Sequence, residues 1–402
     1  MSGIYRLKGS IKHYDWGGDS FIPHLLQIEN KENRPFAEYW LGAHANDDCK
    51  IEIEGKDVLL KEYIGKHHEV LGKKVRKKFK EFPFLLKALD VKDMLSIQVH
   101  PSKKAAKKEF KRENKEGIPF DSPKRNYKDD NHKPELMVAM SDFWLLHGFK
   151  RKKEIRNILQ TIPEFNLLLI LFEKFGYEGL YKTVMYMPQQ EVNTILKPLL
   201  DRIIPLYKQN KLEKPQEDFW AARAALTFSH QGDIDRGIFS IYLFNLLQLK
   251  KGEGIFQDAG VPHAYLEGQN IEIMASSDNV LRGGLTNKHI DVKELMKHIK
   301  CEATKIKVLK GKKVSGEIIY KTSAPDFELS SLQLKKGKSI SISTDGPEII
   351  LLTSGHASIK DKTVNTELKI GSPAAIVFNK EKIQLTAFED SVLFKASVPD
   401  KR

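Results

Sequence analysis

The chain has 402 residues, of which 41% are hydrophobic, and it carries a formal net charge of +13. This composition excludes a disordered or fibrous protein, and the length allows two or three hydrophobic cores, because single cores stop growing near ~250–300 residues. The basic excess suits an anionic partner, whether nucleic acid, an acidic lipid or a phosphorylated metabolite. Few aromatic residues interleave with the lysine runs, so a nucleic-acid partner is not expected.

The chain lacks the sequence signals of export and of membrane insertion. Residues 1–6 hold no apolar segment typical of a signal peptide, and no run approaches the ~18 apolar residues of a membrane span. The two cysteines, Cys49 and Cys301, are too few for a disulfide framework. We therefore expect a cytoplasmic protein with no membrane partner.

Short strands and turns open the chain. Aromatic residues and turn glycines at 3–7, 13–18 and 36–42 predict strands separated by turns. Residues 58–80 have the apolar periodicity of a helix instead.

An apolar run at 84–89 predicts a buried strand, which we expect to pair with 94–100 across a turn at 90–93. Lys87 interrupts the first of these strands. A lysine inside an apolar strand needs a partner or a cavity, so Lys87 is a candidate for a site-facing role.

The run at 95–101 presents two possible metal ligands from one strand. Successive side chains of a strand point to opposite faces, so Gln98 and His100 share one face with Ser96. Taken alone, such a pair is more often an ordinary surface pair than a metal site.

Residues 103–128 are charged and predict a short helix followed by a long surface loop, and long loops beside rigid strands are often functional. Glu135 then opens an apolar strand. A carboxylate that points into a core is unfavourable unless it is paired or bound to metal.

From residue 151 to residue 231 the pattern becomes helical, and Pro198 and Pro205 should kink or break one of the helices. Strand signals return after this segment, and His263 lies in a turn-like run where a hydrogen-bonded histidine is the usual interpretation. From about 313 to 396 the residues alternate with turns at the spacing of a sandwich or jelly roll.

These patterns predict three units. Residues 1–150 together with 232–310 form a β domain that holds the candidate site residues, 151–231 form an α-helical insertion, and 311–402 form a C-terminal jelly-roll β domain.

Five stretches, taken together and in their order along the chain, resemble the type I mannose-6-phosphate isomerases. The resemblance extends from about residue 4 to residue 300, is weaker beyond, and implies a mainly β fold of cupin-type jelly-roll domains with an α-helical insertion. Tyr39 and Leu41 depart from the family's common Leu and Met, which bears on substrate fit and not on metal binding. The five stretches lie at 36–42, 95–101, 131–135, 261–266 and 274–283.

The resemblance implies one Zn²⁺ per chain, bound by four residues that its motifs carry over: Gln98, His100, Glu135 and His263. Two imidazoles, one carboxylate and one amide suit zinc, and they also suit Mn²⁺, Fe²⁺ or Co²⁺. The single carboxylate leaves the ion a net positive charge, so it remains a good Lewis acid.

The implied activity is the interconversion of mannose 6-phosphate and fructose 6-phosphate, by proton transfer between C1 and C2 through an enediolate. Lys133 and Asp278 are the preferred proton-handling pair, with His132 assisting ring opening. Arg282 suits the developing oxyanion or the phosphate, because its guanidinium binds such groups at two points.

Substrate binding is assigned to Ser96, Lys87, Glu272 and Arg282, and a phosphorylated hexose is the expected partner of a monomeric enzyme. Two alternatives remain open at this point. A cupin-type metal-dependent dioxygenase would use the same ligands with Fe²⁺. A non-catalytic basic sugar-binding or anion-binding protein would bind through its charge, with a strong dependence on salt.

Overall fold

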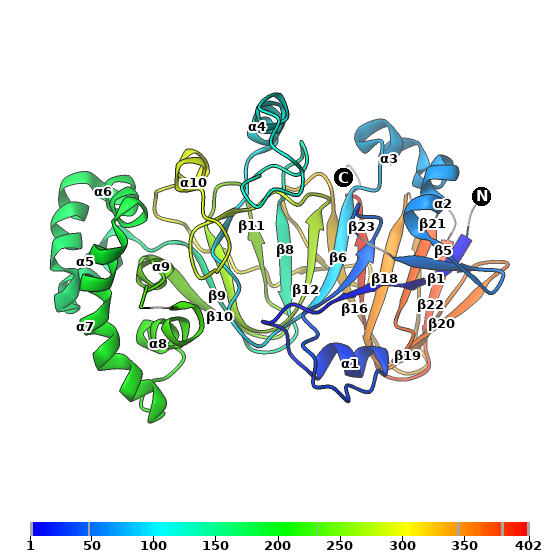
Figure 1. Ribbon diagram of the computed structural model, residues 1–402. Coiled ribbons are helices and arrows are strands. Elements are labelled where there is room, and N and C mark those ends of the chain that lie inside the picture. Colours follow the sequence, from blue (N-terminus) through cyan, green and yellow to red (C-terminus); the bar gives the residue numbers. More distant parts are fainter. Residues whose placement is uncertain (1–2, 47–48, 231, 344–345, 379–381, 400–402) are drawn as a thin grey trace.

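The computed structural model describes the chain except for residues 1–2, 47–48, 231, 344–345, 379–381 and 400–402. Figure 1 shows helices gathered at one end, a group of antiparallel strands in the middle, and a second β unit at the other end beside both termini. The mainly β fold with a helical region agrees with the fold predicted from the sequence.

The central sheet is built around β12 (His263–Ala275). The first residues of β12 pair with β7 and β9, and its last residues pair with β6 and β8, so one long strand connects both ends of the sheet. The path runs β10 (Phe244–Leu249), β9 (Phe143–Phe149), β12, β6 (Phe84–Val91), β3 (Glu38–Gly42) and β2 (Ser10–Lys12), and the short strands β7 (Gln98–Val99), β8 (Glu135–Ala139), β11 (Gly254–Gln257) and β13 (Leu281–Arg282) pair beside it.

The predicted hairpin between residues 84–89 and 94–100 is wrong. Strand β6 pairs with β3 and β12, whereas β7 has only two residues and pairs with β12 and β13. Every residue of β6 is buried, so the backbone groups along both of its edges need strand partners in place of water. The longer strands β3 and β12 provide these partners, and the two-residue β7 could not.

The C-terminal segment forms a sandwich of two sheets whose apolar faces meet around side chains such as Ile342, Ile350, Ile359 and Leu385. The first sheet runs β14 (Lys312–Val314), β15 (Glu317–Tyr320), β16 (Glu328–Leu334), β23 (Ser391–Ser397), β18 (Glu348–Ser354), β21 (Ala374–Phe378), β1 (Gly3–Lys8), β4 (Lys50–Ile53) and β5 (Lys56–Leu59). The second runs β17 (Ser339–Ser343), β22 (Lys382–Ala387), β19 (His356–Lys360) and β20 (Asn365–Lys369).

Three N-terminal strands thus extend a sheet of the C-terminal unit. Strand β1 pairs antiparallel with β21, with Gly3 opposite Phe378, and carries β4 and β5 on its other side. The division of the chain into three units stays a prediction. The shared sheet puts strands from residues 1–150 and strands from residues 311–402, which were assigned to different units, side by side.

The helical segment packs around one apolar cluster that includes Phe172, Tyr181 and Trp220. Helix α7 continues past Pro198 and Pro205, so the chain does not break there; both prolines face solvent while the opposite side of the helix is buried. The helices of this segment are α5 (Lys152–Thr161), η2 (Pro163–Phe165), α6 (Asn166–Tyr186), α7 (Gln189–Lys208), α8 (Glu217–Phe228) and α9 (Gly237–Leu243).

Within the described residues, no single helix has the length and apolar character needed to cross a membrane. The one pair that meets these criteria together, Lys152–Thr161 with Pro163–Tyr186, is bent by 116°.

The remaining helices lie around the β units (Figure 1). They are α1 (Phe21–Leu26), α2 (Leu60–Lys66), η1 (His68–Leu71), α3 (Gly72–Phe79), α4 (Lys103–Lys115) and α10 (Val292–His298). As predicted, 103–128 forms a short helix, α4, and then a long loop.

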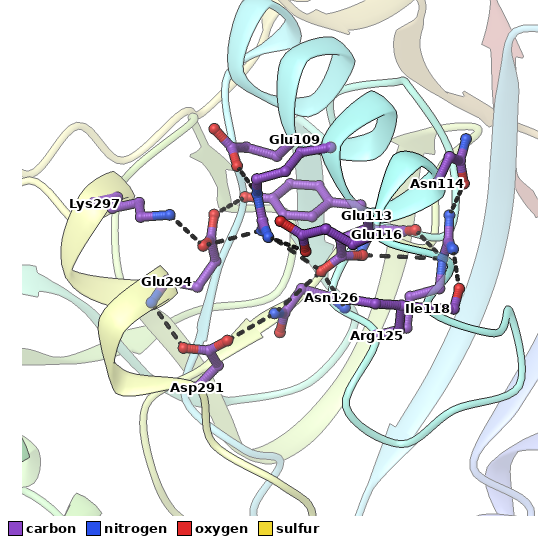
Figure 2. A network of polar contacts seen from close by, with 12 residues as sticks. Glu109, Glu113, Asn114, Glu116, Ile118, Arg125, Asn126, Asp291, Glu294 and Lys297 are labelled. Atoms are coloured by element: carbon purple, nitrogen blue, oxygen red, sulfur yellow. Dashed lines mark hydrogen bonds and ion pairs between the residues drawn. The ribbon is translucent and has the colours of Figure 1, made fainter.

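A polar network holds that loop against α10 (Figure 2). The Tyr127 hydroxyl donates to Glu294 Oε1 at 2.8 Å, and Asn126 Nδ2 donates to Asp291 Oδ2 at 3.0 Å. The Arg125 guanidinium donates to the carbonyl of Tyr127 and to that of Ile118. The charged loop is therefore ordered by buried hydrogen bonds, and it leads directly into the residues before Glu135.

Candidate active site

Three residues from separate strand ends converge on one point. His100 directly follows β7, Glu135 is the first residue of β8, and His263 is the first residue of β12. Glu135 Oε2 lies 3.4 Å from His100 Nε2 and 3.2 Å from His263 Nε2, and all three side chains are buried. One potential ligand atom from each residue lies within 4.8 Å of the others, close enough for all three to hold one metal ion.

Both imidazoles are oriented by hydrogen bonds from their far nitrogens. His100 Nδ1 donates to the carbonyl of Asn279 at 2.9 Å, and His263 Nδ1 donates to the carbonyl of Val261 at 3.0 Å. These bonds leave the unprotonated Nε2 of each ring available to coordinate a metal ion. His100 Nε2 is buried and has no hydrogen-bond partner, which fits a position reserved for a metal ion.

The protonation states also suit a metal. Burial lowers the pKa of His100 to about 4, so its ring is neutral near pH 7. Burial opposes ionisation of Glu135, but Lys133 and His100 outweigh this effect and hold the pKa of Glu135 well below its usual value. Metal binding needs these two states, a neutral imidazole and a carboxylate.

Gln98, the fourth predicted ligand, lies beside this cluster. It stands directly opposite His263 in the pairing of β7 with β12, and opposite Arg282 in the pairing of β7 with β13. Gln98 lines the same cavity as Glu135 and His263. Its coordination through the amide oxygen stays a prediction.

A small cavity of about 60 Å³, here called the inner cavity, opens beside the ligands. Lys133 lies on its wall, with Nζ 3.1 Å from Glu135 Oε1. A cavity of this size has room for a few water-sized groups, enough for the reacting end of a small substrate. The residues that line it are Glu38, Lys87, Leu89, Leu95, Ser96, Gln98, Lys133, Glu135, His263, Ala264, Tyr265 and Glu272.

Lys87 has the carboxylate partners that its place in an apolar strand requires. Its Nζ lies 3.3 Å from Glu272 Oε1 and 3.6 Å from Glu38 Oε2, and 5.0 Å from the centre of the Trp40 ring. Burial alone would lower the pKa of Lys87, but the two carboxylates raise it, so the ammonium group stays protonated. Burial and the charge of Glu135 raise the pKa of Glu272, which accepts a hydrogen bond from the Tyr265 hydroxyl at 2.7 Å.

A larger pocket of about 770 Å³, here called the outer pocket, adjoins the inner cavity. The two spaces share four lining residues, here called the junction: Glu38, Leu95, Ser96 and Gln98.

Arg282 and Lys288 also line the outer pocket, and within the described part of the chain no carboxylate forms an ion pair with either. Burial lowers the pKa of Arg282, and burial together with the Arg282 charge lowers the pKa of Lys288. Two cations without a counter-ion make this pocket suitable for an anionic group.

Two predicted catalytic residues do not line either space. His132 Nε2 lies 2.8 Å from Asp326 Oδ2, which belongs to the segment between β15 and β16. Asp278 accepts from Asn46 Nδ2 at 2.8 Å, and its other oxygen lies 3.5 Å from His44 Nε2. Their catalytic roles stay predictions.

Glu38 and Tyr265 line the inner cavity and were not among the predicted site residues. Both had a sequence signal. Glu38 is a carboxylate within an apolar run, the same pattern that selected Glu135, and Tyr265 follows His263 by two residues, which on a strand puts both side chains on one face.

The fold and this cluster define a metal-dependent enzyme of the cupin type. The family model of the type I phosphomannose isomerase catalytic domain matches residues 4–152. The Escherichia coli (strain K12) mannose-6-phosphate isomerase is 33% identical over 388 residues, covering 94% of this chain and 96% of that protein. The human mannose-6-phosphate isomerase is 29% identical over 426 residues, covering 98% of each chain. The chain belongs to the type I mannose-6-phosphate isomerase family.

Solved structures agree with this assignment. The Salmonella typhimurium mannose 6-phosphate isomerase, in a crystal structure with fructose 6-phosphate and zinc, has a TM-score of 0.87 and 29% identity, covering 99% of this chain and all of that one. A zinc-bound mannose 6-phosphate isomerase has the same TM-score and identity.

Proposed function

We propose that this chain is a zinc-dependent isomerase that interconverts mannose 6-phosphate and fructose 6-phosphate. The convergence of His100, Glu135 and His263 beside Lys133, in a chain of this family, carries the proposal. The relatives across bacteria and eukaryotes are mannose-6-phosphate isomerases, which favours this activity over a dioxygenase and over a non-catalytic binding protein.

His100, Glu135 and His263, with Gln98 as the proposed fourth ligand, would hold one zinc ion per chain. The nitrogen and oxygen donors match zinc chemistry, and the related zinc-bound structures support the choice of metal. A bound zinc ion supplies Lewis acidity that stabilises negative charge on substrate oxygens.

Proton transfer between C1 and C2 is assigned first to Lys133. Of the four residues predicted to be catalytic, it is the one on the wall of the inner cavity, where the reacting carbons would lie. Glu135 at 3.1 Å holds its ammonium group in a fixed position. The roles of Asp278 as partner of Lys133 and of His132 in ring opening stay predictions, because neither side chain lines the inner cavity or the outer pocket. The ion pair of His132 with Asp326 favours a structural role for His132.

Arg282 and Lys288 are the proposed phosphate-binding residues. They are cations in the outer pocket, and Ser96 at the junction adds a hydroxyl donor. Lys87 and Glu272 form an ion pair on the wall of the inner cavity, where the sugar end of the substrate would lie.

The test is turnover by the metal-stripped and the zinc-reconstituted protein, with mannose 6-phosphate as substrate and fructose 6-phosphate as the measured product. Activity should appear with about one equivalent of zinc and should be lost in Glu135→Ala, which should no longer retain zinc. Glu154→Ala, a surface change in α5, is the matched control. Stoichiometric zinc binding without turnover rejects the proposal, and oxygen uptake under the same conditions would favour a dioxygenase.

We also propose that the chain works as a cytoplasmic monomer on its phosphorylated sugar substrate. Light scattering on the zinc-loaded protein, at concentrations from micromolar to tens of micromolar, tests the oligomeric state.

A further inference from the structure

Three carboxylates, Glu38, Glu135 and Glu272, line the inner cavity. Among the described residues, one of their oxygens has neither a hydrogen-bond donor nor a place beside the metal position. Both oxygens of Glu135 have an assignment: Oε1 pairs with Lys133, and Oε2 faces Nε2 of His100 and of His263, where the metal ion would lie. Glu272 is likewise used at both oxygens, by Lys87 and by the Tyr265 hydroxyl.

Glu38 differs, because only its Oε2 has partners. Trp40 Nε1 donates to that oxygen, and Lys87 Nζ lies 3.6 Å from it. Among the described residues, none donates to Oε1 of Glu38. Oε1 is not one of the fully buried atoms without a partner, and Glu38 lines both spaces of the site, so this oxygen opens on them and is available as an acceptor to a ligand.

The position of this oxygen is fixed by its surroundings. Glu38 begins β3, a strand buried along its whole length between β2 and β6, with Glu38 itself opposite Lys12 and Leu89. The contacts of Oε2 then hold the side chain in place. Such a preorganised acceptor loses little conformational entropy when a ligand binds.

Glu38 also stands at the passage between the two spaces of the site. It lines the inner cavity and the outer pocket, together with Leu95, Ser96 and Gln98. In the proposed function the reacting C1 and C2 lie in the inner cavity and the phosphate lies beside Arg282 in the outer pocket. The middle of the hexose chain therefore crosses the junction, where its C3 and C4 hydroxyls come within reach of Glu38.

We propose that Glu38 is a specificity-determining residue whose Oε1 accepts a hydrogen bond from the C3 or the C4 hydroxyl of the sugar phosphate. This inference rests on the proposed function and extends it to a residue that the metal and proton-transfer steps do not use. A site built to bind a hydroxyl discriminates strongly against an analogue that lacks it, because the buried acceptor is then left unpaired.

Glu38→Gln tests the contact with little change in shape. The glutamine oxygen would turn to Trp40 Nε1, which can only donate, and the amide NH₂ would then face the junction in place of the acceptor. We expect the KM for mannose 6-phosphate to rise at least tenfold, while the zinc content and the unfolding temperature stay close to those of the unchanged protein. Glu52→Gln, which changes a half-exposed carboxylate near Lys8, is the matched control and should leave the KM unchanged.

Deoxy analogues separate this contact from an indirect effect through Lys87. The dissociation constants of mannose 6-phosphate, 3-deoxymannose 6-phosphate and 4-deoxymannose 6-phosphate are measured by calorimetry on the zinc-loaded protein and on Glu38→Gln. One of the two deoxy analogues should bind both proteins with similar affinity, whereas mannose 6-phosphate and the other analogue should lose at least tenfold.

An equal loss for all three ligands, or no loss for any, overturns the proposal. Each dissociation constant is measured at equilibrium, where on an active protein it refers to the mixture of the aldose and its ketose, so the comparison does not depend on the rate of turnover. A protein that binds mannose 6-phosphate but does not convert it would reject the proposed activity, and the pattern across the analogues would still decide the contact of Glu38.

Discussion

The ring of His100 donates its Nδ1–H to the backbone carbonyl of Asn279, over a distance of 2.9 Å. The side chain of Asn279 is fully buried and donates to the carbonyls of Asp129 and Asn131, at 2.9 and 2.8 Å. Its oxygen accepts from the backbone N–H of Lys128 at 2.8 Å. One asparagine thus connects the orientation of a candidate metal ligand with the loop that leads to Glu135.

Removal of this connection should weaken metal binding. Asn279→Ala takes away the hydrogen bonds that hold the carbonyl behind His100, and loss of such an outer contact typically costs 10- to 100-fold in metal affinity. The measurement is the rate of zinc release to a chelator, together with the visible absorption spectrum of the cobalt-substituted protein, at a temperature where the variant is folded.

Asn193→Ala is the control for Asn279→Ala. Asn193 makes comparable amide hydrogen bonds in the helical segment, to Gly232 and Ile234, so its loss should lower stability without changing zinc release. Equal zinc release from both variants would show that Asn279 has no particular effect on the metal site.

Lys133→Met should remove proton transfer and leave the metal in place. A positioned acid or base contributes about 10²- to 10⁴-fold to a rate, so kcat should fall within that range, with the zinc content unchanged. Lys128→Met, which removes an ammonium group bonded to the Phe120 carbonyl at the surface, is the control. A kcat within threefold of that of the unchanged protein would exclude Lys133 as the proton-handling residue.

His132→Ala should act on stability more than on catalysis. The change leaves the Asp326 carboxylate buried without its histidine partner, which costs about 2 kcal/mol of the free energy of unfolding. We expect a lower urea midpoint and a kcat within about threefold of the original. Unchanged stability with a large loss of kcat would instead support a role in ring opening.

Acid should weaken the network between α4 and α10 through Glu294 (Figure 2). Burial would raise the pKa of Glu294, but hydrogen bonds from His298, Lys297 and Tyr127 outweigh it and lower the pKa to about 2. A carboxyl group whose pKa is lower in the folded state stabilises the fold above its unfolded value of ~4.3, and this stabilisation is lost as the pH falls toward 2.

Glu294→Gln should therefore destabilise the metal-free protein by about 2 kcal/mol at pH 7, and the difference should shrink below about pH 4. Urea unfolding of both proteins across this pH range measures the effect. Glu116→Gln, at the exposed edge of the same network, should change stability much less. A difference that is constant with pH would show that Glu294 is not ionised in the folded protein.

Much of the site was predictable because it contains charged residues within apolar runs, where burial without a partner is unfavourable. Glu135 and Lys87 are both buried, as their positions in apolar strands indicated, and His100 and His263 meet Glu135 as the family motifs implied. The chemistry of each side chain is local information, and it needs no knowledge of the neighbours.

Neighbour relations were less predictable. The hairpin expected between 84–89 and 94–100 does not form, since the choice of strand partners depends on which distant strands can cover both edges of β6. The partner of His132 is 194 residues away, and no pattern near His132 indicates Asp326.

Residue types and their positions in apolar runs thus determined which charged groups need a partner or a metal, because the cost of burying a charge is a property of each side chain. The choice of zinc came from the family resemblance. Only the tertiary structure decided that Oε1 of Glu38 has no donor at the junction among the described residues, while Glu272 is paired at both oxygens and Glu135 lies between Lys133 and the metal position. Such differences arise from distances between segments far apart in the chain, and packing alone sets those distances.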